Sequence, residues 1–175
     1  AGWNRGRLNS YLIEITAHVL SVTDDRTGQP IVDVILDRAG QKGTGRWSAI
    51  ESAHLGIPAT TVESAVAARS ISAMKALRQE AEKRFGLPPS GQLAPLSPEK
   101  VTMLEQALLA GKIIAYAQGF AVMAAASKEF GWNTPLGTVA RIWRAGCIIR
   151  SQFLGEIADA LDALPEAESL LLTDV

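Results

Sequence analysis

Apolar residues recur along this chain at helical rather than alternating spacing. Between residues 8 and 21, for example, they fall at Leu12, Ile15, Val19 and Leu20. No stretch shows the strict alternation that is typical of a half-buried strand. The pattern therefore predicts an all-α fold, a single multi-helix domain over residues 1–175. Helices are expected over residues 8–21, 31–37, 48–55, 60–85, 97–130, 134–145 and 151–163, with an irregular connection over 86–95. Thr60 or Thr61 is expected to cap the helix over 60–85, and Thr134 the helix over 134–145. The last helix is amphipathic, with one apolar side made of Phe153, Leu154, Ile157, Ala158 and Leu161.

The longest predicted helix begins with a strong start signal. Ser97 supplies a hydroxyl cap, Pro98 occupies the first helical position, and Glu99 places a negative charge in the first turn. The apolar pattern then continues to about Phe130, and Gly131 is expected to end the helix. Such a helix is about 50 Å long.

Small residues recur every four positions along this helix, at Ala107, Gly111, Ala115 and Gly119. Their side chains leave one face nearly free of bulk, so another backbone is able to approach it closely. Glycine disfavours a helix by up to about 1 kcal/mol relative to alanine, and close packing is the expected compensation. We therefore expect this helix to form the buried centre of the domain.

Composition excludes several classes of protein. A length of 175 residues with 47% hydrophobic and 20% charged residues suits a single globular domain. The net charge of −1 argues against a general nucleic-acid surface. One cysteine and two histidines predict neither a disulfide framework nor a metal site. Lys112 and Gln118 interrupt the longest apolar region, so no membrane span is expected.

Residues 38–46 carry the most distinctive chemistry of the chain. They include three cations, three glycines, the hydroxyl of Thr44 and no carboxylate. A helical pattern resumes at Trp47, where Ser48 and Glu51 resemble a capping box. Because a helix N-terminus attracts anions, Lys42 and Thr44 are candidates for holding a phosphate-sized group there. An exposed turn with solvated charges is the alternative interpretation.

Arg69 is a second candidate. Its neighbours on the predicted helix face are Ala65, Val66, Ser72 and Ala73, none of which is a carboxylate. An arginine on such a face requires an anionic partner from elsewhere, since an unpaired buried charge is costly. That partner is either a ligand or an acid on another helix, unless the side chain reaches water. Arg78, by contrast, is expected to be an ordinary surface charge.

Other prominent side chains are interpreted as structural. Tyr116, Met123 and Trp132 are expected in the core, and Cys147 is expected to be inert because its surroundings are apolar. Arg141, Arg144 and Arg150 are expected to make structural contacts.

The string Asp37-x-x-Gly40-Gln41-Lys42-Gly43-Thr44-Gly45-x-Trp47 resembles the signature of 6-phosphogluconate dehydrogenases, the decarboxylating enzymes of the pentose phosphate pathway. Four further stretches resemble the same family in the same order, at residues 3–6, 10–16, 112–120 and 142–151. The resemblance therefore extends from the first residues to about Leu154. It implies that the domain is the helical C-terminal part of such an enzyme.

The resemblance also implies the ligands. The family oxidatively decarboxylates 6-phosphogluconate to ribulose 5-phosphate with NADP, as a cytoplasmic homodimer. Lys42 and Thr44 match the family's phosphate-binding lysine and threonine, and Arg69 matches its phosphate-binding arginine. Arginine suits this task because its planar fork binds two phosphate oxygens at once.

Other parts of the family's active site are expected outside residues 1–175. These are the upstream Rossmann domain that binds the coenzyme and distinguishes NADP from NAD, the helix with the catalytic lysine and glutamate, and the C-terminal tail that reaches the partner subunit. No catalytic, cofactor-binding or metal-binding residue is therefore assigned within the chain. It is expected to bind the substrate phosphate, to dimerise, and to be inactive alone.

Two alternatives are kept. One is a free-standing helical module that binds an anion or a partner without catalysis. The other is a related 3-hydroxyacid dehydrogenase, against which the Lys-Gly-Thr-Gly string favours a phosphorylated sugar acid. An upstream Gly-x-Gly-x-x-Gly after a predicted strand would decide for the enzyme.

Overall fold

The computed structural model describes residues 1–86, 95–167 and 169–173. Every regular element in these residues is a helix, and the β-type pairings among them are two isolated bridges, Ser10 with Ser151 and Thr23 with Pro30. The predicted all-α fold is confirmed, while the expected connection over 86–95 falls mostly outside the described residues. The elements are η1 (Gly2–Arg5), α1 (Tyr11–Val19), α2 (Ile31–Val34), α3 (Thr44–His54), α4 (Thr60–Ala73), α5 (Lys75–Phe85), α6 (Pro98–Glu129), α7 (Leu136–Ile142), α8 (Phe153–Ala163) and η2 (Leu170–Leu172).

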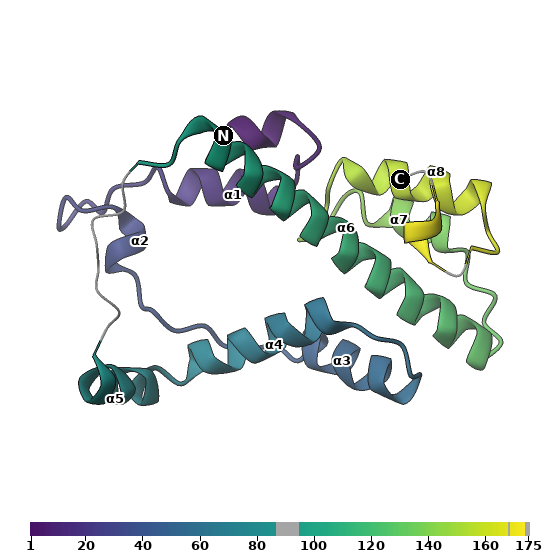
Figure 1. The fold of residues 1–175 in the computed structure, drawn as a ribbon, viewed down its shortest axis with the longest axis horizontal. Coiled ribbons are helices and arrows are strands. Elements are labelled where there is room, and N and C mark those ends of the chain that lie inside the picture. Colours follow the sequence, from purple (N-terminus) through teal and green to yellow (C-terminus); the bar gives the residue numbers. More distant parts are fainter. Residues whose placement is uncertain (87–94, 168, 174–175) are drawn as a thin grey trace.

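The helices are arranged around α6, the longest element (Figure 1). The N-terminal elements η1 and α1 lie beside the first half of α6, whereas α7, α8 and η2 lie beside its second half. Helices α3 and α4 pack on each other in a separate row, which α5 continues. This row contacts α6 through α4.

The core lies where α7 and α8 pack against the middle of α6. The predicted apolar face of α8 is fully confirmed, because each of its five members is at most 8% exposed: Phe153, Leu154, Ile157, Ala158 and Leu161. Ala117 and Phe120 of α6, Ala140 of α7 and Leu170 of η2 complete this cluster. The core is small for a chain of this length, because α7, α8 and η2 pack against only one side of α6.

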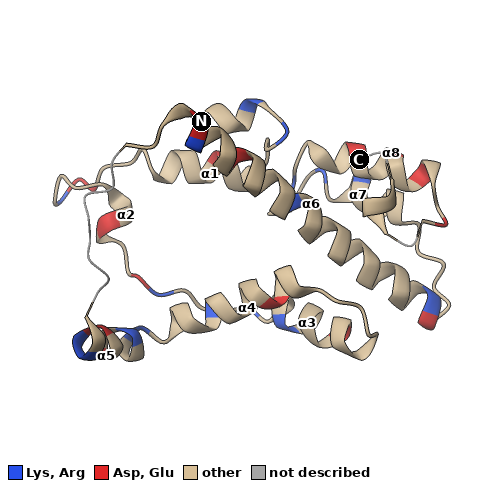
Figure 2. Ribbon diagram, viewed as in Figure 1, with Lys and Arg blue, Asp and Glu red and all other residues tan. Residues whose placement is uncertain are grey.

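Helix α6 starts as predicted but is not a buried centre. The Ser97 hydroxyl accepts a hydrogen bond from the Lys100 N–H, and Pro98 is the first helical residue. Only Ala117, Phe120 and Ala126 of the helix are buried. Figure 2 shows that the rest of its second half carries no charge until its last turn. The expectation of a buried central helix is therefore wrong for this chain by itself, because the neighbouring helices cover only part of the α6 surface.

The stripe of small residues on α6 is not filled by another backbone. At Gly111 and Gly119, no neighbouring heavy atom lies within 4 Å of an added Cβ. By length and composition α6 resembles a membrane-spanning helix, with a mean hydropathy of 1.5 over its most apolar window. One such helix does not identify a membrane protein, because core helices of soluble proteins share these properties.

The expected core residues divide. Tyr116 and Met123 pack against the core cluster, as predicted. Trp132 is 63% exposed and stacks on Phe130, so its assignment to the core is wrong. Cys147 is half-buried, and its thiol lies 3.1 Å from the Trp143 carbonyl oxygen; its expected inertness stays a prediction.

Two predicted helix starts are wrong in informative ways. Helix α3 begins at Thr44 rather than near Trp47, and the Ser48 hydroxyl donates to the Thr44 carbonyl at 3.0 Å inside the helix. The predicted capping box of Ser48 and Glu51 therefore does not form. Helix α7 begins at Leu136, and Thr134 does not cap it: its N–H donates to the Ser127 hydroxyl instead.

Two predicted helices are interrupted before their expected ends. The segment predicted as one helix over 60–85 is divided at Met74, whose φ of −88° and ψ of 49° are not helical. The helix expected over 31–37 ends at Val34, because Ile35 is extended. Both interruptions lie next to the loop that follows α2.

The first and last thirds of the chain meet in a short antiparallel pairing. The Ser151 hydroxyl and the Gln152 N–H both donate to the Asn9 carbonyl, at 3.0 and 3.2 Å. Beside them, Arg150 pairs with Glu14 at 2.9 Å. Elsewhere Arg141 pairs with Asp162, and its pKa is raised by that contact. The structural interpretation of these two arginines is confirmed, although exposed ion pairs of this kind contribute little to stability.

A glutamine from α6 caps α4. The Gln118 side-chain carbonyl accepts from the Thr61 N–H at 2.9 Å, and its amide donates to the Thr60 hydroxyl at 3.0 Å. The expectation that Thr60 or Thr61 caps this helix is therefore wrong, because the cap comes from a side chain of another helix. This contact fixes the α3–α4 row to α6.

Replacing Gln118 by alanine is expected to lower the free energy of unfolding by about 1–2 kcal/mol, because it leaves the Thr61 N–H without its acceptor. Urea-induced unfolding followed by circular dichroism measures the change. Gln118→Glu is the matched control, since its carboxylate still accepts from this N–H. Equal losses in both variants would contradict the capping role.

Candidate functional site

Lys42, Thr44 and Arg69 line one cleft of about 400 Å³ between the start of α3 and one side of α4. Lys42 and Thr44 belong to the turn that enters α3, and Arg69 lies in the third turn of α4. Ile148 closes the cleft from the segment after α7. The predicted convergence of the three side chains is confirmed as geometry, while their ligand stays a prediction.

The start of α3 forms one wall of this cleft. Gly43 has a φ of +104°, in the left-handed region that favours glycine, and the chain enters the helix directly after it. The N–H groups of residues 44–46 therefore have no acceptor within the helix and lie at the positive end of its dipole. Because the helix begins inside the Lys-Gly-Thr-Gly string, these groups stand in the same turn as the Lys42 and Thr44 side chains.

Close packing holds α3 against α4 at this point. A Cβ added to Gly45 would lie 3.1 Å from a methyl carbon of Val66. That distance is shorter than an ordinary van der Waals contact, so a side chain at this position would require Val66 to shift by a few tenths of an ångström. The glycine thus sets the spacing between the N-terminus of α3 and the face of α4 that carries Arg69.

Hydrogen bonds fasten the preceding loop to α4. The Ala39 N–H donates to the Ser72 hydroxyl at 3.2 Å, and the Gln41 amide donates to the Ser70 hydroxyl at 2.9 Å. The loop therefore runs antiparallel to α4, and this path places Lys42 near Arg69.

The two cations of the cleft are exposed and have no carboxylate partner among the described residues. Arg69 is not buried, which corrects the expectation that burial demands an anion. Its guanidinium donates to the Gly40 carbonyl, which orients the side chain along the loop. Two unneutralised cations beside a helix N-terminus favour a multiply charged anion over an uncharged ligand.

Arg78 of α5 is not the ordinary surface charge that was expected, because it has partners on two other segments. Its guanidinium donates to the Asp37 carboxylate at 2.8 Å and to the Asp37 carbonyl at 2.7 Å. It also donates to the Ser72 carbonyl at 3.3 Å. The hydrogen bond and the charge of Arg78 lower the pKa of the Asp37 carboxyl, so this contact is kept at neutral pH and lost as the pH falls through that lowered pKa.

Sequence reasoning missed the side chains that hold the loop. Gln41 lies inside the recognised string and Ser72 on the predicted helix face of Arg69, but the sequence assigns neither of them a role. Their role depends on the antiparallel path of the loop along α4, which no local spacing shows. A polar residue on an otherwise apolar helix face, such as Ser72, was the available signal.

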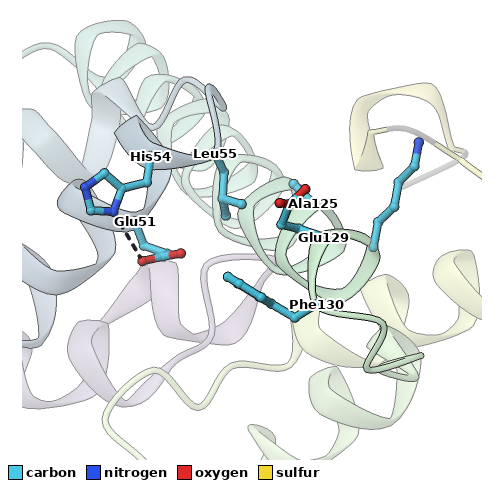
Figure 3. A pocket seen from close by; sticks show the side chains of 7 residues that line it. Glu51, His54, Leu55, Ala125, Glu129 and Phe130 are labelled. Carbon is cyan, nitrogen blue, oxygen red and sulfur yellow. Dashed lines mark ion pairs between the residues drawn. The ribbon is translucent and has the colours of Figure 1, made fainter.

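A second cavity, of about 790 Å³, lies between the ends of α3 and α6 (Figure 3). Glu51 and His54 of α3 face each other across 3.8 Å there, and Glu129 and Phe130 come from the end of α6. It contains none of the predicted site residues, and its mixed charges do not select an anion. Among the described residues, no group of three or more metal-ligating side chains is found.

Comparisons with known proteins show which family the chain resembles. A family model described as 6-phosphogluconate dehydrogenase, C-terminal domain, matches residues 1–175. The NADP-dependent decarboxylating 6-phosphogluconate dehydrogenase of Bacillus subtilis is 48% identical over 175 residues, which is 98% of this chain and 37% of the relative. An NAD-dependent one from the same organism is 44% identical over 170 residues, 97% of this chain and 36% of the relative.

A solved structure shows the same fold. Plasmodium falciparum 6-phosphogluconate dehydrogenase, studied in its apo form and in complex with NADP+ and with 6-phosphogluconate, has a TM-score of 0.85 and 45% identity. The match covers 99% of this chain and 37% of that protein. The chain thus spans little more than a third of the length of these relatives. It belongs to the 6-phosphogluconate dehydrogenase family, in the part that forms the C-terminal domain.

Proposed function

We propose that this chain is the substrate-binding and dimerisation portion of an enzyme that oxidatively decarboxylates 6-phosphogluconate to ribulose 5-phosphate with NADP. The observation that carries the proposal is the convergence of Lys42, Thr44 and Arg69 on one cleft at the start of α3. The names of the relatives support the substrate and the reaction.

The cleft suits the phosphate end of the substrate. Lys42 contributes a point charge, Arg69 a planar pair of donors, and Thr44 a neutral hydroxyl. The free N–H groups of residues 44–46 add donors that need no side-chain movement. No acid, base or hydride-handling group is assigned here, so the chemistry belongs to other parts of the complete enzyme.

The cofactor is proposed as NADP, bound mainly outside these residues. Relatives named for NADP and for NAD are almost equally similar to this chain, at 48% and 44% identity. Similarity in this region therefore does not distinguish the two cofactors, as expected if another domain reads the ribose.

A homodimer is proposed because the chain leaves much apolar surface uncovered. Its accessible area is 12536 Å², whereas a compact monomer of 18.6 kDa exposes about 8,200 Å². The excess is of the size that obligate interfaces bury. We further infer a cytoplasmic protein that binds neither nucleic acid nor membrane, from its charge balance and from the soluble metabolic relatives.

The proposal is tested by titrating the purified chain with 6-phosphogluconate and, as a control, with gluconate, which lacks the phosphate. Calorimetry is expected to show binding of the first alone, without NADPH formation when NADP is added. The same preparation at tens of micromolar should sediment as a dimer. Equal binding of both acids, NADPH formation or a strictly monomeric mass would contradict the corresponding part of the proposal.

A further inference from the structure

Arg78 lies at a junction between three segments. It is the fourth residue of α5, and its side chain reaches back over the break at Met74 to the end of α4 and across to Asp37. Its side chain is 32% exposed, so it is partly enclosed by these partners. The residue thus touches the helix that carries Arg69 and the first residue of the loop that carries Lys42.

The helix break makes this junction possible. In a continuous helix the Ser72 carbonyl would accept from the N–H of residue 76. Because α4 ends at Ala73, that carbonyl is one of the free acceptors of the helix end, and Arg78 donates to it. A cation at this position also faces the negative end of the α4 dipole.

Ser72 joins the loop from the other side. Its carbonyl accepts from Arg78, and its hydroxyl accepts from the Ala39 N–H, two residues after Asp37. Arg78, Ser72, Asp37 and Ala39 therefore form one closed set of contacts, which we name the loop latch. The latch lies just before residues 41–45, which line the cleft.

We propose that Arg78 is a positioning residue, which holds the Lys42 loop in register with Arg69 through the loop latch. This inference rests on the proposed function of the cleft as a phosphate site. Arg78 does not line the cleft itself. Its effect on a ligand is exerted through the place of the loop.

The fork of the guanidinium is essential to this role. One nitrogen donates to the Asp37 carboxylate, and the other donates to the Asp37 and Ser72 carbonyls. A lysine ammonium is a single point and does not span these three acceptors in one plane. Charge alone therefore does not replace Arg78, and Arg78→Lys should behave more like Arg78→Ala than like the parent.

The first test is calorimetric titration of the chain with inorganic phosphate and with 6-phosphogluconate. Arg78→Ala is expected to weaken both by about tenfold, because misplacing a binding group costs affinity steeply. Arg84→Ala removes the same charge from the same helix and should leave binding unchanged. A loss of equal size in Arg84→Ala would overturn the proposal in favour of a long-range charge effect.

A cycle with Lys42 separates positioning from general destabilisation. If Arg78 acts through the loop, Arg78→Ala should weaken phosphate by about tenfold in the parent but by no more than about twofold in Lys42→Ala, because the displaced group is already gone. Equal losses in both backgrounds would show that Arg78 does not act through Lys42.

Amide hydrogen exchange tests the latch without any ligand. The Ala39 N–H should exchange faster in Arg78→Ala, and less so in Asp37→Asn, where the Asp37 carbonyl contact survives. Unchanged exchange overturns the latch whatever the ligand data show. If Ala39 exchanges faster in Arg78→Ala but the parent chain binds no phosphate, the contacts of the latch are established. The proposed function is then refuted, and the positioning role with it.

Discussion

Replacing Lys42 and Arg69 together by alanine is expected to abolish the stabilisation that phosphate and 6-phosphogluconate give to this chain. Charge-assisted hydrogen bonds contribute about 1.5–3 kcal/mol each, so each single replacement should weaken binding by about 10- to 150-fold. Thr44→Val removes only a neutral donor and should cost about 1 kcal/mol. Thermal unfolding at rising phosphate concentration measures the effect, because a ligand that binds only the folded state raises the midpoint.

The two cations call for different controls. Arg69 also donates to the Gly40 carbonyl, so its replacement loosens the loop in addition to removing the charge. Arg69→Lys keeps the charge and loses the fork, which separates these effects. Lys42→Ala is the cleaner variant, since no hydrogen bond or ion pair of Lys42 occurs among the described residues. Unchanged phosphate binding by Lys42→Ala would contradict the assignment of the cleft as a phosphate site.

Phe153→Ala is expected to lower the free energy of unfolding by about 3–5 kcal/mol, a large fraction of the stability of a domain. The ring is fully buried at the start of α8, and its centroid lies 6.1 Å from that of Tyr116. Arg7 and Lys112 lie over the same ring, at 5.3 and 5.6 Å. Truncation therefore opens a cavity in the small core and removes two cation–π contacts at once.

Chemical denaturation of the chain checks this value against a matched phenylalanine. Phe85 is 79% exposed at the end of α5, and Phe85→Ala should change the free energy of unfolding by no more than about 0.5 kcal/mol. If the two variants lose the same stability, the core does not lie where α6, α7 and α8 meet.

The sequence was most informative where structure depends on local pattern. The apolar face of α8 was predicted residue by residue, because an amphipathic helix buries the same face whichever partner covers it. The start of α6 was predicted for a similar reason, since Ser97 and Pro98 act within one turn. The convergence of Lys42 with Arg69 was predicted from family resemblance, as no spacing rule relates a loop to a distant helix.

The errors concern contacts between distant segments. Apolar composition indicated that α6 is buried on most of its surface, whereas among the described residues only part of the helix is covered. The break at Met74 lies beside the Arg78 contacts to Asp37 and Ser72. Local helix propensity does not include such contacts, so the sequence predicted one continuous helix. The cap of α4 by Gln118 was missed for the same reason, because Thr61 and Thr60 precede Gln118 by 57 and 58 positions.

The pairing of Asn9 with Ser151 also orders events during biosynthesis. These residues are 142 positions apart, so at about 5–20 residues per second the N-terminal segment emerges from the ribosome about 7–28 s before its partner is made. Throughout that interval the Asn9 carbonyl lacks both donors that it has in the folded chain, the Ser151 hydroxyl and the Gln152 N–H. The link between the segment before α1 and the segment before α8 is therefore completed only after translation has passed Ser151.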